Sequence, residues 1–359
     1  MKNVVLIAVA VFAAAFASCG NSQTPTATTM QAPVQSACAA PTQPVREDRF
    51  VPIGGVEQWV TIHGETCANP VVLFLHGGPG NTLSPYAEAI YGPWARDFTL
   101  VQWDQPGAGR TFGRNPPTDD TTLTLDRMAQ DGIALAHYLT QRLGKKKIIL
   151  TGGSWGSILG VRMVKARPDL FYAFVGVSQA VHYRDNLTAS YTKLMGLARA
   201  KNDQVSMAAL ESIGPPPWVN PRSFGILRRL SRPYEAASST PAPSNWWAPS
   251  AEYNTPARLA EYEGGEDFSF LQFVGLKGDG MFSRVDLPAM ASTFDVPVFL
   301  IHGSQDLVAI PEVAQRYFDG IRAPTKEFLV VPKAGHDPNE ALVDAQYRTL
   351  LQRVRPLAQ

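Results

Sequence analysis

One glycine-rich turn constrains the fold more than any other stretch of this sequence. Residues 151–157 read TGGSWGS and come directly after the run KKKIIL, whose aliphatic end has the composition of a buried strand. Glycines before and after Ser154 remove Cβ atoms that would obstruct a sharp turn. The next segment, WGSILGVRMVKARP, has helical spacing of apolar residues and stops at Pro168. A strand, a tight turn with serine at its apex and a helix predict a nucleophile elbow.

Apolar runs alternate with amphipathic helical patterns along most of the chain. Residues 49–64 predict a hairpin that turns at Gly54 and Gly55, and further apolar runs begin near residues 71, 99, 147, 171, 296 and 326. Continuous apolar strands that alternate with helices are typical of a mainly parallel sheet with both faces covered. The sequence therefore predicts an α/β core in two parts, at residues 49–181 and 291–359.

This alternation is interrupted between residues 182 and 290. The stretch combines helix-like segments with proline-rich runs such as GPPPWVNPRSF, and it is rich in Trp, Tyr and Phe. We interpret it as an inserted, mostly helical cap and not as an independent domain. Its aromatic residues either form a small core of the cap or line a substrate site, and the sequence leaves both open.

Composition and motifs exclude several classes of function. The 359 residues carry a formal net charge of +1, and the densest basic run is the KKK at 145–147, so we expect no nucleic-acid partner. The chain has no metal motif and no phosphate-binding loop, so we expect neither metal nor cofactor. The GAG of DQPGAGRT, at 104–111, precedes a proline-rich stretch, which predicts a loop there and not the helix that a dinucleotide site requires.

The N-terminus has the pattern of a bacterial export signal. Residues 1–18 combine a basic start, an apolar core and small residues before Cys19. We expect this signal peptide to be removed and Cys19 to be lipidated, which would anchor the protein to a membrane on the periplasmic side or at the cell surface. Phe16 departs from the lipoprotein pattern, and ordinary cleavage after Ala17, giving a periplasmic or secreted protein, is the alternative. Residues 19–48 lack periodicity and predict a flexible tether.

Two further cysteines, Cys38 and Cys67, remain if Cys19 is acylated. Export to an oxidising compartment permits them to form a disulfide. The sequence leaves a disulfide and two free thiols open, because it does not give the distance between the two residues.

Three loops that follow predicted strands carry the groups that a serine nucleophile needs. A serine hydroxyl requires a base within hydrogen-bond reach and an acid that orients the base. The loops after residues 298 and 328 supply Asp306 as the acid and His336 as the base, and Ser154 is at the elbow. The order serine, acid, histidine is that of an α/β-hydrolase. His302 is a rival base and Asp337 a rival acid.

Acyl transfer also needs donors for the oxyanion of its tetrahedral intermediate. The backbone N–H of Trp155 is one candidate, and the loop HGGPG at 76–80 supplies the second. Together with DQPGAGRT, GGSWGS and the acid and base loops, HGGPG resembles the proline iminopeptidase family of α/β-hydrolases. The resemblance covers roughly residue 51 to the C-terminus outside the cap. It implies an eight-stranded core, a helical cap, a Ser154, His336, Asp306 triad, and Gly78 with Trp155 as oxyanion donors.

Members of that family are serine exopeptidases that remove an N-terminal residue, often proline, without a cofactor. The sequence departs from them at Pro106, where the family usually has arginine, and it lacks a recognisable Trp- and Glu-containing cap motif for the substrate's amino group. The densest acidic group of the cap contains Glu261, Glu263, Glu266 and Asp267. We consider it a candidate ammonium site, with a solvated helix face as the alternative.

These observations predict an exported serine aminopeptidase that acts on short peptides through an acyl-enzyme. An esterase or other small-acyl hydrolase with the same triad is the alternative, and a lipoprotein that uses the fold only for binding is a third possibility. The sequence gives no oligomeric state.

Overall fold

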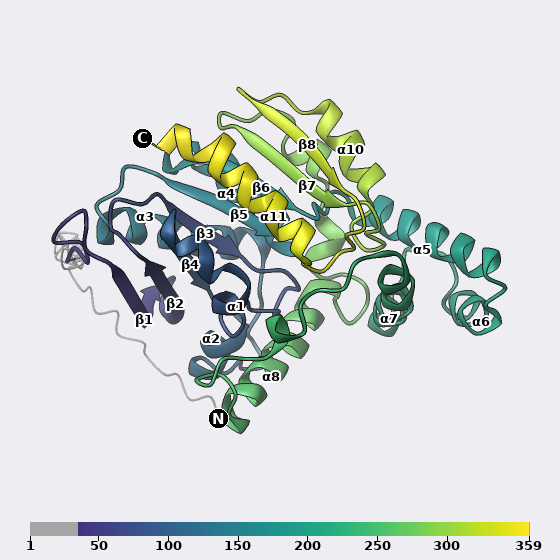
Figure 1. The fold of residues 1–359 in the computed structure, drawn as a ribbon. Helices are drawn as coiled ribbons and strands as arrows, with labels where there is room; N and C mark the ends of the chain where they lie inside the picture. Colours follow the sequence, from purple (N-terminus) through teal and green to yellow (C-terminus); the bar gives the residue numbers. More distant parts are fainter. Residues whose placement is uncertain (1–34, 359) are drawn as a thin grey trace, which may run out of the picture. The chain divides into compact units, whose positions relative to one another are not determined.

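The computed structural model of the protein describes residues 35–358, which form an eight-stranded sheet with helices on both faces (Figure 1). The order across the sheet is β1-β2-β4-β3-β5-β6-β7-β8. β1 and β2 form the predicted hairpin, β2 pairs antiparallel with β4, and all other pairs are parallel. The strands are β1 Val45–Ile53, β2 Val56–Gly64, β3 Val71–Leu75, β4 Thr99–Trp103, β5 Ile148–Gly153, β6 Phe171–Val177, β7 Val298–Gly303 and β8 Lys326–Val331.

The pleat of the central strands explains their uninterrupted apolar sequences. In β3, Val71 and Leu73 face a core that includes residues of α3 and α4, whereas Val72 and Phe74 face a second core with α1 and α11. Both faces are buried, so both sets of alternating positions are apolar. The helices of this part are α1 Ala87–Tyr91, α2 Gly109–Arg114, α3 Leu125–Arg142, α4 Trp155–Ala166, α10 Pro311–Gly320 and α11 Glu340–Thr349.

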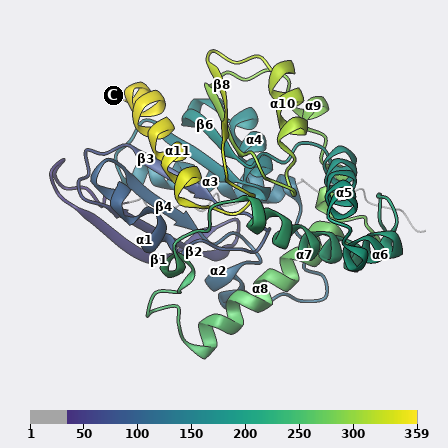
Figure 2. The ribbon, with the colours of Figure 1, turned by 45° about the vertical axis from the view of Figure 1, so that its right-hand side comes forward.

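The cap is inserted between β6 and β7, as predicted. Its helices are α5 Tyr183–Ala200, α6 Gln204–Ile213, α7 Pro221–Ser238, α8 Pro256–Val274 and α9 Leu287–Met290. Figure 2 shows α5, α6 and α7 grouped on one side, with α8 running beneath the strands in that view. Some aromatic residues of the cap pack on one another, among them Tyr183, Trp218 and Phe224, and several, Phe224 included, line the cavity described below. Both roles that the sequence left open therefore occur.

The N-terminal part differs from the predicted tether. β1 begins at Val45, inside the predicted range 19–48, because Val45 pairs with Gly64 in the edge hairpin. Cys38 and Cys67 form a disulfide, with their Cα atoms 5.8 Å apart, so the segment before β1 is fixed to the loop after β2. The predicted signal peptide 1–18 and Cys19 lie outside the described residues. Within residues 35–358, every helix is too short or too polar to cross a membrane.

The prediction of a loop after the GAG is wrong for the first part of that stretch, where the chain forms the short helix α2. Gly107 and Gly109 have positive φ angles of 81° and 48°, which glycine adopts easily. The buried Asp104 carboxylate accepts the backbone N–H of Arg110 at 2.9 Å and so caps the first turn. This cap depends on a residue before the turn, which explains why helical periodicity alone missed a helix of six residues.

Candidate active site

Ser154 occupies a strained turn between β5 and α4. Its φ of 52° and ψ of −116° are unusual for a residue with a side chain. A Cβ at Gly152 would lie 2.2 Å from the carbonyl oxygen of Gly156, and a Cβ at Gly156 would lie 2.1 Å from that of Leu75. These two glycines are therefore required by backbone contacts. Gly153 differs, because a Cβ there would meet nothing within 4 Å.

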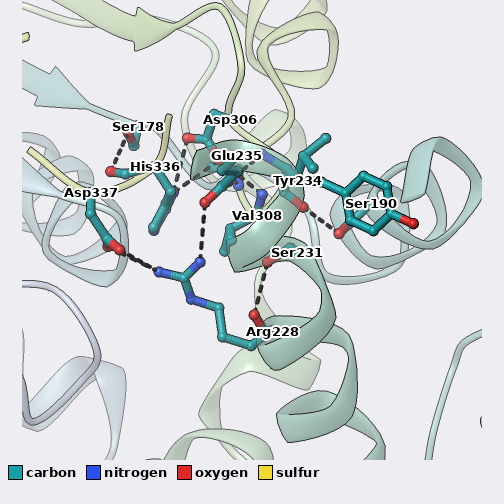
Figure 3. A network of polar contacts seen from close by, with 12 residues as sticks. Ser178, Ser190, Arg228, Ser231, Tyr234, Glu235, Asp306, Val308, His336 and Asp337 are labelled. Atoms are coloured by element: carbon teal, nitrogen blue, oxygen red, sulfur yellow. Dashed lines mark hydrogen bonds and ion pairs between the residues drawn. The ribbon is translucent and has the colours of Figure 1, made fainter. Parts of the chain in front are cut away.

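The structure brings the three predicted triad residues together. Nε2 of His336 lies 3.0 Å from Oγ of Ser154. Nδ1 of the same imidazole lies 2.9 Å and 3.0 Å from the two carboxylate oxygens of Asp306. Figure 3 shows Asp306 and His336 side by side within a larger polar network. This is the geometry in which a carboxylate orients a histidine that can remove the serine proton.

Burial and hydrogen bonding set the charges of this pair. Asp306 is fully buried, and its Oδ1 accepts the backbone N–H groups of Val308 and Ala309, each at 2.8 Å. Burial opposes ionisation of Asp306, but the charge of His336 and the hydrogen bond to it hold the pKa of Asp306 below its ordinary value. Burial likewise opposes the imidazolium, yet Asp306 holds the pKa of His336 above its ordinary value of 6.5.

The two rival residues make other contacts. Nε2 of His302 accepts the backbone N–H of Gln179 at 2.7 Å, and burial lowers the pKa of His302 to about 4, so this imidazole is neutral at pH 7. The Asp337 carboxylate accepts hydrogen bonds from Arg228 at 2.9 Å and 3.0 Å. Neither residue competes with the Asp306–His336 pair.

The HGGPG loop packs directly against the elbow. A Cβ at Gly77 would lie 3.4 Å from that of Ser154, and Gly78 has a positive φ of 105°. Trp155 is the first residue of α4, and N–H groups at this position have no acceptor within a helix. Gly78 and Trp155 both line the cavity beside Ser154. This arrangement suits two backbone donors aimed at one oxyanion.

Gln105 connects the loop and the elbow. Its side chain accepts the indole N–H of Trp155 at 2.9 Å and donates to the carbonyl oxygen of His76 at 3.2 Å. Its backbone N–H donates to Nε2 of His76 at 3.2 Å, and burial lowers the pKa of His76 to about 4, which keeps that nitrogen an acceptor. The DQPGAGRT motif thus supports the predicted oxyanion site from behind. Pro106, the departure within this motif, does not line the cavity.

The sequence comparisons agree with the geometry. A model of the alpha/beta hydrolase fold matches residues 70–340. The chain belongs to the α/β-hydrolase fold family. Its relatives include a probable aminopeptidase of Bacillus subtilis, 26% identical over 80% of this chain and 89% of the relative, and a probable proline iminopeptidase of Streptomyces coelicolor, 27% identical over 79% and 90%. The crystal structure of a proline iminopeptidase of Mycobacterium smegmatis shares the fold, with a TM-score of 0.62 and 20% identity over 87% of this chain and 99% of that one.

A cavity of about 730 Å³ lies between the core of this α/β-hydrolase and its cap. Ser154 and His336 line it together with many aromatic side chains: Phe74, Tyr86, Tyr91, Phe224, Trp247, Tyr262, Phe270, Phe273 and Phe282. The volume is that of a site for a small molecule or a short peptide. Within residues 35–358, no group of three or more His, Cys, Asp or Glu side chains is placed to hold a metal ion.

Of the predicted cap glutamates, only Glu266 lines the cavity, together with Asp267. Glu261 forms an ion pair with Arg258 at 2.6 Å and lies over Gly113 of α2, and Glu263 is exposed outside the cavity. Helical geometry explains this division, because neighbouring residues of α8 point in different directions. The acidic cluster of the sequence is therefore spread around the helix.

Sequence reasoning missed two residues of this hydrolase that lie beside the triad, Glu235 and Arg228 of α7 (Figure 3). Glu235 is buried. The signal that could have identified it is spacing: Leu227, Ser231 and Glu235 follow one another at intervals of four and share one face of the helix. An acidic residue on the buried face of a helix needs a specific partner.

Proposed function

We propose that this hydrolase is a serine aminopeptidase that releases the N-terminal residue from short peptides. The observation that carries the proposal is the hydrogen-bonded chain Ser154–His336–Asp306, whose serine and histidine line the cavity. Two relatives that align with this chain over most of their length are named as a probable aminopeptidase and a probable proline iminopeptidase, and they support a peptidase in particular.

The reaction follows from the geometry of the triad. His336 takes the proton of Ser154 as the hydroxyl attacks the first peptide carbonyl, and the oxyanion binds the N–H groups of Trp155 and Gly78. The imidazolium then protonates the leaving amine, which departs and leaves an acyl-enzyme. Water, deprotonated by His336, releases the amino acid and restores Ser154.

Glu266 supports recognition of a free N-terminus. It lines the cavity and is half-buried, and within residues 35–358 its carboxylate has no hydrogen-bond or ion-pair partner. Its backbone lies against the oxyanion loop, since a Cβ at Gly80 would be 2.8 Å from Cα of Glu266. A carboxylate near the attacked carbonyl is the group that would bind an α-ammonium.

A second candidate function, hydrolysis of small esters, is favoured by the aromatic lining of the cavity. An apolar acyl group would bury its surface there without needing an ammonium site. A panel of prolyl, alanyl and N-blocked arylamides, with an aryl ester beside them, separates the two. We expect turnover of the free-amino arylamides and none of the blocked ones. Equal turnover of blocked and free arylamides would rule out recognition of a free amino group, and ester turnover without arylamide turnover would replace the aminopeptidase with an esterase.

The third possibility, a binding protein without activity, is tested by a fluorophosphonate probe. We expect the probe to label Ser154 in the wild type and to leave the Ser154→Ala variant unlabelled. Failure of the wild type to react would support the non-catalytic alternative.

We also propose that the protein is exported and anchored through Cys19. The Cys38–Cys67 disulfide supports export, because such bonds persist in oxidising compartments. Metabolic labelling with a fatty-acid analogue tests the anchor, and the Cys19→Ala variant should not incorporate it. Release of that variant from the membrane fraction is the accompanying result.

A further inference from the structure

The cap is hydrogen-bonded to the loop that carries the triad acid. Oε1 of Glu235, on α7, accepts the backbone N–H of Leu307 at 2.7 Å, and Leu307 directly follows Asp306. From α5, the hydroxyl of Ser190 donates to the carbonyl oxygen of the same Leu307. Two cap helices therefore hold both backbone polar groups of Leu307, the residue next to Asp306. The following two N–H groups bind the Asp306 carboxylate itself.

The same cap helix also reaches the loop that carries the base. Arg228 lies 3.4 Å from the Glu235 carboxylate and donates to Asp337, the neighbour of His336, at 2.9 Å and 3.0 Å. On the other side of the histidine, a Cβ at Gly335 would lie 3.4 Å from that of Glu235. Figure 3 shows Arg228 between Glu235 and Asp337, with Asp306 and His336 adjacent. One glutamate and one arginine thus contact both loops.

This pair is poorly explained as a device for stability alone. Glu235 is 6% exposed, and burying an ion pair costs so much hydration that apolar residues of the same volume often serve as well. Its contacts are with the residues that adjoin Asp306 and His336, while most of α7 packs within the cap. What distinguishes the Glu235–Arg228 pair is that it contacts the neighbours of both Asp306 and His336.

We propose that Glu235 and Arg228 are positioning residues through which the cap holds the acid loop and the base loop in their catalytic arrangement. The inference rests on the proposed catalytic role of Ser154, His336 and Asp306, and it adds the cap to that machinery. Displacement of α7, for instance when substrate enters, would change the alignment of His336 with Ser154.

The charges in this network act on His336 in opposite directions. The groups that face it are Asp306, Asp337, Glu235 and Arg228, with His302 buried behind Asp306. Arg228 lowers the pKa of His336 and Asp337 raises it. Burial, followed by the charge of Asp306, raises the pKa of Glu235, and attraction between Glu235 and His336 works against that rise. Removal of the arginine and removal of the glutamate should therefore shift the titration of His336 in opposite senses.

Three variants test the inference through the rate of fluorophosphonate labelling, which needs the triad but no particular substrate. Glu235→Ala removes both the charge and the acceptor for Leu307, whereas Glu235→Gln keeps an acceptor oxygen and removes only the charge. Arg228→Met removes the bridge to Asp337. The matched controls are Glu211→Gln on α6 and Arg222→Met at the start of α7, which are exposed and lie outside the cavity.

We expect Glu235→Ala to react with the probe at least roughly 10-fold more slowly than the wild type, because it loses about one charged hydrogen bond. The labelling rate of Glu235→Gln should fall less. The acid limb of the labelling rate should move to lower pH in Glu235→Gln and to higher pH in Arg228→Met. Both controls should match the wild type. Thermal unfolding establishes that each variant is folded.

Wild-type labelling in a folded Glu235→Ala variant would overturn the inference. If that variant does not fold, the opposite pH shifts of Glu235→Gln and Arg228→Met decide, and the absence of both shifts overturns it. Failure of the aminopeptidase proposal looks different, because the wild type would then label normally and leave every free-amino arylamide intact.

Discussion

The protonation state of His336 sets the pH range in which Ser154 can react. The base must be neutral to accept a proton, so activity is lost as pH falls through the pKa of His336. Asp306 raises that pKa above 6.5 against the effect of burial. We therefore expect kcat/KM to fall about tenfold per pH unit on an acid limb centred above pH 6.5.

Asp306→Asn tests the cause of that acid limb. Without the carboxylate, the limb should move to lower pH, and activity should fall by something on the order of 10⁴-fold, because an amide does not hold the imidazole in the required tautomer. The pH dependence of kcat/KM for both proteins checks this. An acid limb that stays in place would mean that another group controls the titration.

The three glycines around Ser154 have different roles, and alanine substitution should separate them. Gly152→Ala and Gly156→Ala would force a Cβ to within 2.2 Å and 2.1 Å of carbonyl oxygens, so we expect each to destabilise the fold by about 3 kcal/mol or more. Gly153→Ala is the matched control and should unfold at nearly the wild-type temperature, because its Cβ meets no atom. Equal losses in all three would show that backbone flexibility, and not close contact, selects glycine here.

At the scale of helices and strands, the sequence predicted what is encoded by local pattern. β3 to β7 appear as apolar runs because both their faces are buried, and the loops after them carried recognisable motifs. α2 was missed because the group that caps it, Asp104, belongs to the preceding turn. The cap was harder still: Glu235 is recognised only once α7 is seen against the loop at Leu307, a contact 72 residues apart in the chain.

Helix α8 offers a direct test of amino-terminal recognition. Glu266→Gln should raise KM for free-amino arylamides by about 10-fold or more, because it removes the charge that would bind the ammonium, and it should leave aryl ester turnover unchanged. Glu263→Gln is the control, since Glu263 lies on the same helix but is exposed outside the cavity. If the two variants gave the same KM, Glu266 would have no part in binding the amino group.

Across the whole sheet, opposite ends of the parallel strands carry different structures. The triad loops leave the carboxyl ends of β5, β7 and β8. Cys67 lies just before β3, and its carbonyl oxygen accepts a hydrogen bond at 2.7 Å from Lys145, which lies just before β5. The disulfide to Cys38 therefore fixes the N-terminal segment at the amino ends of the parallel strands, opposite the ends that carry the triad.

This separation predicts that the disulfide stabilises the protein without contributing to its chemistry. The bond closes a loop across 29 residues, and in the chain-entropy model a loop of that length contributes about 3 to 4 kcal/mol to the free energy of unfolding. In denaturant unfolding, the variant that combines Cys38→Ala with Cys67→Ala should lose that amount of free energy of unfolding. At temperatures well below its unfolding temperature, it should react with the fluorophosphonate probe at the wild-type rate.

Reduction provides the matched comparison for this pair of variants. A reductant should destabilise the wild type by a similar amount and leave the double variant unchanged, since the variant has no bond to lose. If the folded double variant labelled slowly, the two ends of the parallel strands would be coupled. The segment before β1 would then have to influence the triad along the strands.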